Sequence, residues 1–239
     1  MISLAGNADF ADRLSNTYYG MKIRSYLNAY GVGYDFCRFY VGLGESDGVL
    51  LCFNGSAVCD GNFSDEDIYS FLGFCRPHNL EISGGERCFD GYRAVKRIMF
   101  GFTVPEGFIA EEIKSDDSLD SHFRIIKSGF PETDYEKWLV DISHRKRHGV
   151  SKLFKFKEIA SATMQFCFDD FAFFSEIAVL PECRGQGAAR RMLYSIAAEF
   201  AEKGISCGLF ALPHRMGFYR EIGFRELFED NIYYSIGDS

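Results

Sequence analysis

The sequence predicts a mixed α+β fold in which short strands and helices alternate along the whole chain. Phe173–Leu180 is a brief apolar run rich in β-branched and aromatic residues, and it ends at Pro181 as buried strands often do. An amphipathic stretch follows, and then a second apolar run, Ile205–Leu212. This strand–helix–strand order, preceded by a hairpin turn at Asp169-Asp170, predicts a mixed sheet packed against helices.

The N-terminal half has the order helix, strand, strand, helix, strand. A helix is expected over Asp12–Tyr30, with Gly31 at its end. Ser64, followed three residues later by Asp67, is expected to cap a second helix that runs to about Cys75. No nucleotide or metal motif occurs in this half. The strands expected here are Phe36–Val41, Gly48–Cys59, Leu80–Ser83 and Tyr92–Phe102.

The segment Thr103–Ser118 is the expected domain boundary. It contains Pro105, Gly107 and five acidic residues, a composition typical of exposed connections. We therefore expect an N-terminal α+β domain over residues 1–105 and a second domain over residues 106–239.

The second domain is expected to begin with two helices. Leu119–Lys127 stops before Gly129, and Asp134–His148 stops at Gly149. The strands that follow are Val150–Phe156, Ser161–Phe168 and Phe171–Leu180, with a closing strand near Ile232–Ile236.

A turn with almost no side-chain bulk lies between Leu180 and the helix expected over Gln186–Lys203. Because the first turn of a helix carries unsatisfied N–H groups and the positive end of the helix dipole, such a turn predicts a pyrophosphate site. Its glycines would let the anion approach closely. The turn residues are Arg184, Gly185, Gln186, Gly187, Ala188 and Ala189. The apolar face of the helix is formed by Ala189, Met192, Leu193, Ile196, Ala197 and Phe200.

Residues 177–191 read IAVLPECRGQGAARR, in which the order R-x-x-G-x-A follows V-x-P. This segment strongly resembles the acyl-CoA pyrophosphate signature of the GCN5-related N-acetyltransferase (GNAT) family. No Lys-Ser or Lys-Thr pair follows the last glycine, so the segment is not a Walker A loop, and the early G-x-G of dinucleotide-binding folds is absent. The resemblance implies the GNAT fold for the C-terminal half.

A second motif lies downstream, where Phe218–Phe224 reads FYREIGF. It matches the F-Y-x-x-x-G-F segment that the same family carries on its last helix, and the two motifs stand in the family's order. The resemblance covers roughly Phe108–Ser239. It implies that the strand Ile205–Leu212 splays from the preceding parallel strand and so forms a slot for pantetheine.

The first half has the strand and helix order of a reduced version of the same fold. We therefore favour a tandem arrangement with an active C-terminal copy and a degenerate GNAT-like N-terminal copy. This interpretation rests on element order, because no sequence repeat is visible. The alternative is an unrelated α+β domain that covers the sheet edge and shapes the substrate pocket.

The resemblance implies acetyl-CoA as cosubstrate and assigns the residues that would hold it. The backbone of Ile177, Ala178 and Val179 would pair with the pantetheine amides, and an N–H near Val179 would stabilise the oxyanion. The turn residues Arg184 to Ala189 would hold the pyrophosphate, and Tyr219 would lie beside the cofactor. Each feature also has a structural interpretation: a buried strand, a solvated Arg184, and a Tyr219 that packs beneath the cofactor with its hydroxyl satisfied elsewhere.

Acyl transfer from a thioester to an amine needs two proton movements. An alkyl ammonium titrates near about 10.4, so a base helps to form the neutral amine, and the departing thiolate needs a proton. Tyr219 occupies the position where the family often places a phenol for the second role.

The catalytic base is less clearly marked. Many relatives carry a glutamate on the penultimate strand or an asparagine at the start of the last helix. Here these places read Gly208-Leu209-Phe210 and Pro213-His214. Glu176 and His214 are the candidate bases; the alternatives are that Glu176 is an outward strand residue and His214 a helix-start residue. Without a dedicated base, either ordered water carries the proton or a polar pocket selects the neutral amine.

His144 and His148 lie four residues apart on a predicted helix, a spacing that can hold a metal. Arg145, Lys146 and Arg147 lie between them and no carboxylate motif accompanies the pair, so we interpret them as a basic helix end and expect no metal.

The composition is that of an ordinary globular protein, with 47% hydrophobic residues and a net charge of −8. The negative charge argues against a nucleic-acid binder. The eight cysteines show no C-x-x-C pairing and are expected to be small buried residues of a reducing compartment. No apolar run approaches the roughly 18 to 20 residues of a membrane span and no signal peptide is evident, so we expect a cytoplasmic protein with no membrane partner.

The sequence thus favours an N-acetyltransferase that moves the acetyl group of acetyl-CoA directly to a primary amine of a small molecule or peptide. The alternative is a catalytically inactive acyl-CoA-binding sensor or structural module. The acceptor stays open, and the chain is expected to be a monomer or a homodimer.

Overall fold

The computed structural model describes residues 1–83, 87–115 and 118–237. The chain forms two compact units, Met1–Arg97 together with Glu229–Ser239, and Ile98–Phe228. The boundary expected between residues 105 and 106 lies shortly after the division between Arg97 and Ile98. Residues 229–239 were expected in the second domain but belong to the first unit. Residues 116–117 of the expected boundary segment, and residues 238–239, lie outside the described part of the chain.

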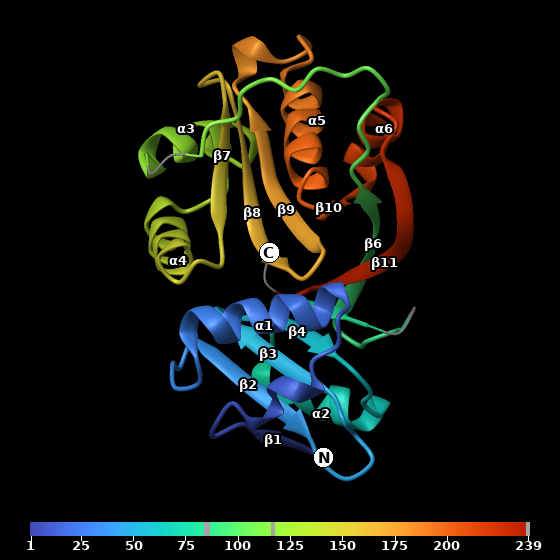
Figure 1. The fold of residues 1–239 in the computed structure, drawn as a ribbon. Helices are drawn as coiled ribbons and strands as arrows, with labels where there is room; N and C mark the ends of the chain where they lie inside the picture. The colour runs from blue at the N-terminus through green and yellow to red at the C-terminus, as the bar shows by residue number, and fades with distance from the viewer. Residues whose placement is uncertain (84–86, 116–117, 238–239) are drawn as a thin grey trace. The chain divides into compact units, whose positions relative to one another are not determined.

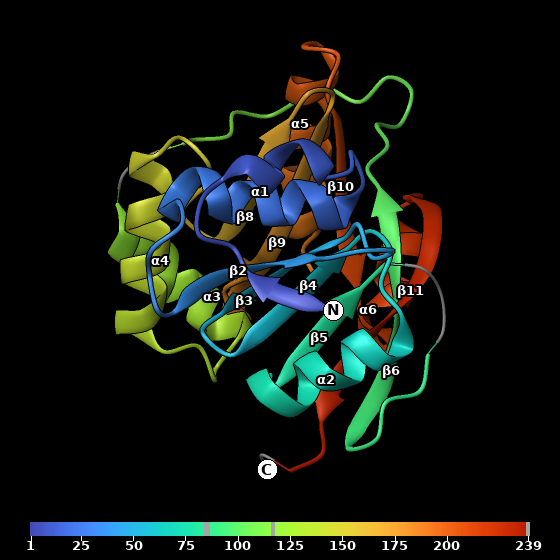
Figure 2. The same cartoon turned by 90° about the horizontal axis from the view of Figure 1, so that it is seen from below.

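The first unit is a mixed sheet with α1 on one face and α2 on the other (Figure 2). Its strands follow the order β1-β2-β3-β4-β5-β11. β4 and β5 are parallel, and the other neighbours are antiparallel. The elements are β1 (Ile2–Leu4), the 3₁₀ helix η1 (Asp9–Arg13), α1 (Tyr18–Tyr30), β2 (Cys37–Gly42), β3 (Val49–Phe53), β4 (Ser56–Asp60), α2 (Asp65–Cys75), β5 (Asn79–Ile82), the first residues of β6 (Tyr92–Gly101) and the last residues of β11 (Arg225–Ser235).

The single strand expected over Gly48–Cys59 was wrong, because this segment is the β3–β4 hairpin. Asn54 and Gly55 form its turn with φ values of 47° and 78°. Two successive positive φ values are what a two-residue hairpin requires, and Asn-Gly is the sequence pair that favours them. The helix expected over Asp12–Tyr30 also begins later, at Tyr18. The Ser15 N–H donates to the Asp60 carboxylate (2.8 Å) and not to a helical carbonyl.

The second unit has a sheet of order β6-β10-β9-β8-β7, with β9 and β10 parallel (Figure 1). The helices and the other strands expected from the sequence are present here, with ends that differ by a few residues, and the mixed α+β fold is confirmed. The closing strand expected near Ile232–Ile236 belongs to β11, and these residues lie in the first unit. The elements are α3 (Leu119–Gly129), α4 (Tyr135–Arg147), β7 (Lys152–Phe156), β8 (Ala160–Phe168), β9 (Phe171–Val179), η2 (Pro181–Cys183), α5 (Ala188–Ala201), β10 (Ser206–Ala211) and α6 (Pro213–Glu221).

One topological motif occurs in both units. β2, β3 and β4 form an antiparallel meander, after which α2 connects β4 to the parallel strand β5. β7, β8 and β9 form the same meander, and α5 connects β9 to the parallel strand β10. This repetition is consistent with the tandem arrangement expected from the element order.

Each motif receives its next strand from the other half of the chain. β6 follows the first motif in sequence, but its last residues pair antiparallel with β10 of the second. β11 follows the second motif, and its residues Ile232–Tyr234 pair antiparallel with β5 of the first. A linear division of the chain therefore cannot reproduce the two units.

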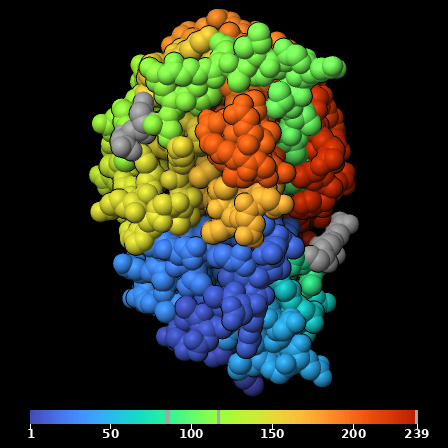
Figure 3. Space-filling model, viewed as in Figure 1, coloured from blue at the N-terminus to red at the C-terminus, as the bar shows by residue number. Residues whose placement is uncertain are grey.

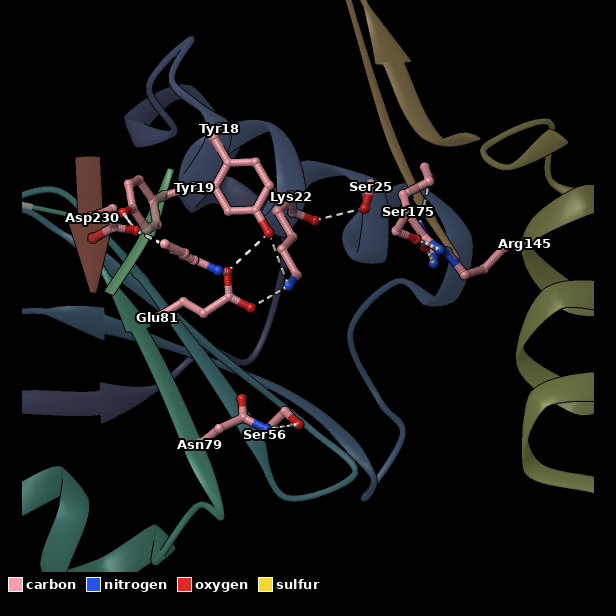
Figure 4. A network of polar contacts seen from close by, with 12 residues as sticks. Tyr18, Tyr19, Lys22, Ser25, Ser56, Asn79, Glu81, Arg145, Ser175 and Asp230 are labelled. Atoms are coloured by element: carbon pink, nitrogen blue, oxygen red, sulfur yellow. Dashed lines mark hydrogen bonds and ion pairs between the residues drawn. The ribbon is translucent and has the colours of Figure 1, made fainter. Parts of the chain in front are cut away.

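A buried polar network closes the first unit where β6 and β11 enter it (Figure 4). Arg97 of β6 donates to Glu81 of β5 (2.8 Å) and to Asp230 of β11 (2.7 Å). Lys22 of α1 also pairs with Glu81, at 2.5 Å. Burial alone would raise the pKa of Glu81, but the positive charges of Lys22 and Arg97 outweigh it and lower the pKa to about 2.

Within the described residues, none of the helices combines the length and the apolar character that crossing a bilayer would require.

Candidate functional site

The second unit contains all the site residues expected from the sequence. β9 carries a β-bulge at the centre of this region. The register shifts between Ser161, which faces Ala178, and Thr163, which faces Ser175, so β9 has one extra residue. Glu176 occupies the bulge with a φ of 52°, a conformation that non-glycine residues rarely adopt. Bulges re-aim side chains, and this one directs Glu176 away from the regular alternation of the strand.

β9 and β10 pair only over their first residues and then diverge. The parallel register joins Ser206, Cys207 and Gly208 to residues 171–173. The following residues of β10, Leu209–Ala211, stay paired with β6 on the other edge of β10 but have no partner in the register with β9. Gly208 sits at the fork: a Cβ there would lie 2.9 Å from the Phe171 ring and 3.2 Å from the Phe100 carbonyl oxygen. The splayed strand pair implied by the family resemblance is present.

The backbone of Val179 points toward the side of β9 that β10 leaves unpaired. The Leu180 N–H donates to the Ile159 carbonyl (2.9 Å), so Leu180 is bonded to the β8 side. Because residues of an antiparallel strand alternate in the direction of their backbone groups, Val179 is turned away from β8. Its carbonyl accepts a hydrogen bond from Arg184 Nε (3.1 Å), which agrees with this direction. The Val179 N–H therefore faces the opening between the strands.

The turn before α5 has an open backbone. Gly185 and Gly187 have φ values of 74° and 75°, and Gly187 is the N-cap without a side-chain hydrogen bond. A Cβ on Gly185 would meet no atom within 4 Å. The N–H groups of Ala188, Ala189 and Arg190 have no acceptor among the described residues. No acidic residue lies in the first turn of α5, so donors and positive dipole are available to an anion.

Arg184 and Gln186 hold this turn in place. Arg184 Nη2 donates to the Ser128 carbonyl at the end of α3 (2.7 Å), in addition to its bond with Val179. Gln186 Nε2 donates to the Glu182 carbonyl (3.1 Å). The guanidinium of Arg184 is thus engaged with backbone oxygens, and its contact with a phosphate stays a prediction.

Residues 102–115, which follow β6, cross the outer surface of α5, as the green stretch in Figures 1 and 3 shows. The Glu111 N–H donates to Ser195 Oγ of α5 (2.9 Å). The Glu111 carboxylate pairs with Lys157 and with Arg191 (3.5 Å). These contacts fix Glu111 about one to two helical turns beyond the glycine turn.

Glu176 is held by two hydrogen bonds that the sequence did not reveal. Thr163 Oγ1 of β8 donates to its carboxylate at 2.7 Å, and Trp138 Nε1 of α4 donates at 3.3 Å. Burial raises the pKa of Glu176, and the two hydrogen bonds and the charge of Arg145 only partly oppose this rise. A carboxylate with a raised pKa is better suited to proton transfer near neutral pH. The partners lie 13 and 38 residues away in sequence, so no local pattern could indicate them.

Tyr219 of α6 is buried in an aromatic cluster. Its ring centroid lies 5.5 Å from that of Phe100 and 6.1 Å from that of Phe224. Burial raises its pKa to about 12, although Arg215 opposes this, so the phenol keeps its proton at neutral pH. No hydrogen-bond partner of its hydroxyl is found among the described residues. Ile177 of β9 packs against the same cluster, so the fold brings these two expected site residues together.

Glu176 and Tyr219 belong to opposite faces of the sheet. A Cβ added to Gly129 of α3 would lie 3.1 Å from Ala178 Cβ, so Ala178 faces α3, whereas Ile177 packs with residues of α5. Trp138, the partner of Glu176, lies in a cluster with Ile126 of α3. The carboxylate therefore belongs to the α3–α4 face and the phenol to the α5–α6 face.

His214 is exposed in the first turn of α6, and the structure shows no contact with Glu176 or Tyr219. The rings of His144 and His148 lie 4.5 Å apart between centroids at the end of α4, tilted by 34° to each other. Within the described ranges, no group of three or more His, Cys, Asp or Glu side chains is arranged to hold a metal ion.

The matching region of the first unit has none of these features. β4 and β5 stay paired from Ser56–Asn79 to Cys59–Ile82 without diverging. α2 begins with a Ser64 cap whose hydroxyl accepts from the Asp67 N–H (3.1 Å), and its first turn carries Asp65, Glu66 and Asp67. The side-chain cap occupies one of the first N–H groups, and the three acids oppose the positive field of the helix start, so this end of α2 does not favour an anion.

Comparison with known proteins agrees with the family resemblance of the two sequence motifs. Residues 140–226 match the model of the Acetyltransferase (GNAT) domain. No curated protein sequence matches the chain.

Solved structures resemble the whole chain in fold. An acetyltransferase from the GNAT family of Colwellia psychrerythraea has 10% sequence identity and a TM-score of 0.59, with 98% of this chain and 99% of that chain covered. A GCN5-related N-acetyltransferase from Sphaerobacter thermophilus has 13% identity and a TM-score of 0.61, with 98% and 94% covered. At these identities the likeness shows the fold alone.

Proposed function

We infer that the chain is an acetyl-CoA-dependent N-acetyltransferase acting on a primary amine, from the premise that residues 140–226 match the model of the Acetyltransferase (GNAT) domain. The use of acetyl-CoA is supported most directly by the divergence of β9 and β10 beside the glycine turn at the start of α5. A slot with a free backbone edge and an anion-binding helix start are the two features that an elongated thioester with a pyrophosphate needs.

The residues of this chain fit that cosubstrate. The open space at Gly185 and the unsatisfied N–H groups of Ala188 to Arg190 suit the pyrophosphate. The Val179 N–H suits an amide or the carbonyl oxygen of the thioester. Bound acetyl-CoA would supply the activated acetyl group.

The proton movements are assigned to two side chains on opposite faces of the sheet. Glu176, with its raised pKa, takes a proton from the acceptor ammonium directly or through water, and Thr163 and Trp138 orient its carboxylate. Tyr219, protonated at neutral pH, donates to the sulfur as the thioester bond breaks. The Val179 N–H stabilises the negative charge that develops on the carbonyl oxygen. His214, which is exposed, is the weaker candidate for the base.

The test is free-thiol release from acetyl-CoA against a panel of amines, paired with calorimetric binding of acetyl-CoA to the same preparation. Amine-dependent thiol release would support the transferase and identify its acceptor class. Binding without turnover on any amine would favour a non-catalytic acyl-CoA module, and absence of binding would contradict the proposed site.

A further inference from the structure

Arg145 of α4 is buried, although its neighbours in sequence are charged or polar. Its side chain is 2% exposed, so it is not part of the basic helix end expected from the sequence. Arg145 Nη1 donates to the side-chain oxygen of Gln165 on β8, and Nη2 donates to the Gln165 carbonyl (2.6 Å). Asp141, one turn earlier on α4, lies 3.7 Å from Arg145 Nη1. The guanidinium thus holds one residue of β8 at both its side chain and its backbone.

Gln165 connects Arg145 to the bulge of β9. Because a guanidinium can only donate, the carboxamide must turn its oxygen toward Arg145, which leaves its nitrogen for another acceptor. Gln165 Nε2 donates to Ser175 Oγ (2.7 Å). Ser175 is the residue immediately before Glu176, and Figure 4 shows the Arg145 side chain extending from its helix toward Ser175. Arg145, Gln165 and Ser175 therefore form a continuous chain of contacts that ends at the bulge.

The bulge is held at two successive residues. Thr163, two residues before Gln165 on β8, donates to the Glu176 carboxylate (2.7 Å), as Trp138 does from α4. Trp138 and Arg145 are seven residues apart, so they lie on the same face of α4. A non-glycine residue with a positive φ, such as Glu176, persists only where the surrounding contacts over-determine its conformation. One strand and one helix face supply these contacts.

We propose that Arg145 is a positioning residue for Glu176. It acts through Gln165, whose amide fixes Ser175 and with it the bulge that aims the carboxylate. The inference rests on the proposed function, in which Glu176 is the base, but the contacts can be tested without any acetyl transfer.

The first test uses the single tryptophan of the chain. Its indole N–H gives one resonance in a ¹⁵N–¹H spectrum, and because this N–H is buried and donates to Glu176, its exchange with water reports whether the carboxylate stays in place. Arg145→Met and Ser175→Ala should each raise the exchange rate about fivefold or more, toward the rate of Glu176→Ala, which lacks the acceptor. The double variant should exchange no faster than the more affected single variant, because both changes break the same chain of contacts.

Arg147→Met is the matched control on the same helix. Arg147 is exposed, and its Nε donates to the Ser143 carbonyl of α4 (3.3 Å) and not to β8. This variant should keep the wild-type indole exchange rate and the wild-type kcat. Thermal melts identify any variant that does not fold. If Arg145→Met fails to fold, Ser175→Ala, which removes one hydroxyl and keeps every charge, decides the test.

The second test connects the position of Glu176 to acetyl transfer. In Arg145→Met and Ser175→Ala, kcat should fall about 10-fold while the Kd for acetyl-CoA stays unchanged, because the glycine turn before α5 is untouched. Arg145→Lys, which keeps a donor for Gln165, should recover part of the loss. A merely structural role of Arg145 would lower the melting temperature without this division between kcat and Kd.

The two tests separate the positioning role from the proposed function. Folded Arg145→Met and Ser175→Ala with the wild-type indole exchange rate would overturn the positioning role, whether or not the chain transfers acetyl groups. Faster indole exchange in these variants, together with a wild type that transfers no acetyl group to any amine, would confirm that Arg145 positions Glu176 and contradict the proposed function instead.

Discussion

The indole Nε1 of Trp138 donates a hydrogen bond of 3.3 Å to the carboxylate of Glu176, so helix α4 reaches the bulge of strand β9. Thr163 holds the same carboxylate from β8. A backbone bulge, a neighbouring strand and a helix on one face of the sheet together fix the position of a single acidic group. That degree of constraint is typical of a group whose direction matters for chemistry.

Trp138→Phe should shift the pH profile of kcat/KM. The aromatic packing against Phe123 survives, but the carboxylate loses a donor that stabilises its ionised form, so the pKa of Glu176 rises further. Since a base acts only when ionised, the acid limb should move to higher pH by about one unit, on the scale of about 1.4 kcal/mol per unit. The measurement is acetyl transfer from pH 5 to 9.

The matched control is Tyr135→Phe on the same helix, whose hydroxyl bonds to Asp120 and not to Glu176. Its profile should coincide with that of the wild type. An unchanged profile for Trp138→Phe would argue against Glu176 as the base. Glu176→Gln should lower kcat/KM by about 100-fold or more while acetyl-CoA binding persists.

Tyr219→Phe should reduce kcat by about 10- to 100-fold and leave the Kd for acetyl-CoA nearly unchanged, because only the proton donor is lost from a cluster that keeps its ring. Calorimetry and initial rates on the same preparation measure both effects. Tyr194→Phe is the control: it also removes one hydroxyl from this cluster, but that hydroxyl donates to the Ile222 carbonyl (2.6 Å). Equal losses of binding and rate in Tyr219→Phe would indicate packing and not catalysis.

Gly187→Val should abolish acetyl-CoA binding, because it fills the open turn and forces a branched side chain to a φ of 75°. The strain alone destabilises the chain, so a control with the same strain is needed. Gly204→Val supplies it, since Gly204 has a φ of 73° just after the other end of α5 and no atom within 4 Å of its Cβ position. Gly204→Val should bind acetyl-CoA normally. Loss of binding in both variants would assign the effect to folding.

The chain should bind one acetyl-CoA. Although both units share the strand–helix–strand motif, α2 begins with a side-chain cap and three acids, and β4 does not part from β5. The expected calorimetric stoichiometry is therefore one, and Gly187→Val should remove all of it. Residual binding in that variant would show that the first unit has kept a functional acetyl-CoA site.

The sequence predicted the second unit well because its signals are local. The glycine turn and the Asp169-Asp170 hairpin each act within a few residues, as does the Ser64 cap in the first unit, and the structure has all of them. The Asn54-Gly55 turn was equally local and was overlooked inside a long apolar run.

The features that escaped prediction depend on contacts distant in sequence. The hydrogen bonds of Trp138 and Thr163 to Glu176 arise only when α4 and β8 meet β9. The exchange of β6 and β11 between motifs is a matter of pairing partners, which apolar periodicity does not specify.

Glu81→Gln should destabilise the chain by about 3 kcal/mol at pH 7, because it leaves the buried Arg97 and Lys22 without a full counter-charge. Glu229→Gln on β11 is the control: Glu229 pairs with Lys96, but both side chains are more than half exposed, so the loss should be below about 1 kcal/mol. The gap between Glu81→Gln and the wild type should depend on pH in a defined direction. The folded-state pKa of Glu81 is lowered to about 2, so its contribution is fully present above the unfolded value of about 4.3 and disappears as pH falls toward 2. Denaturant unfolding at pH 7, 4 and 3 measures this. A gap that stays constant over that range would show that the charge of Glu81 is not what holds β5, β6 and β11 together.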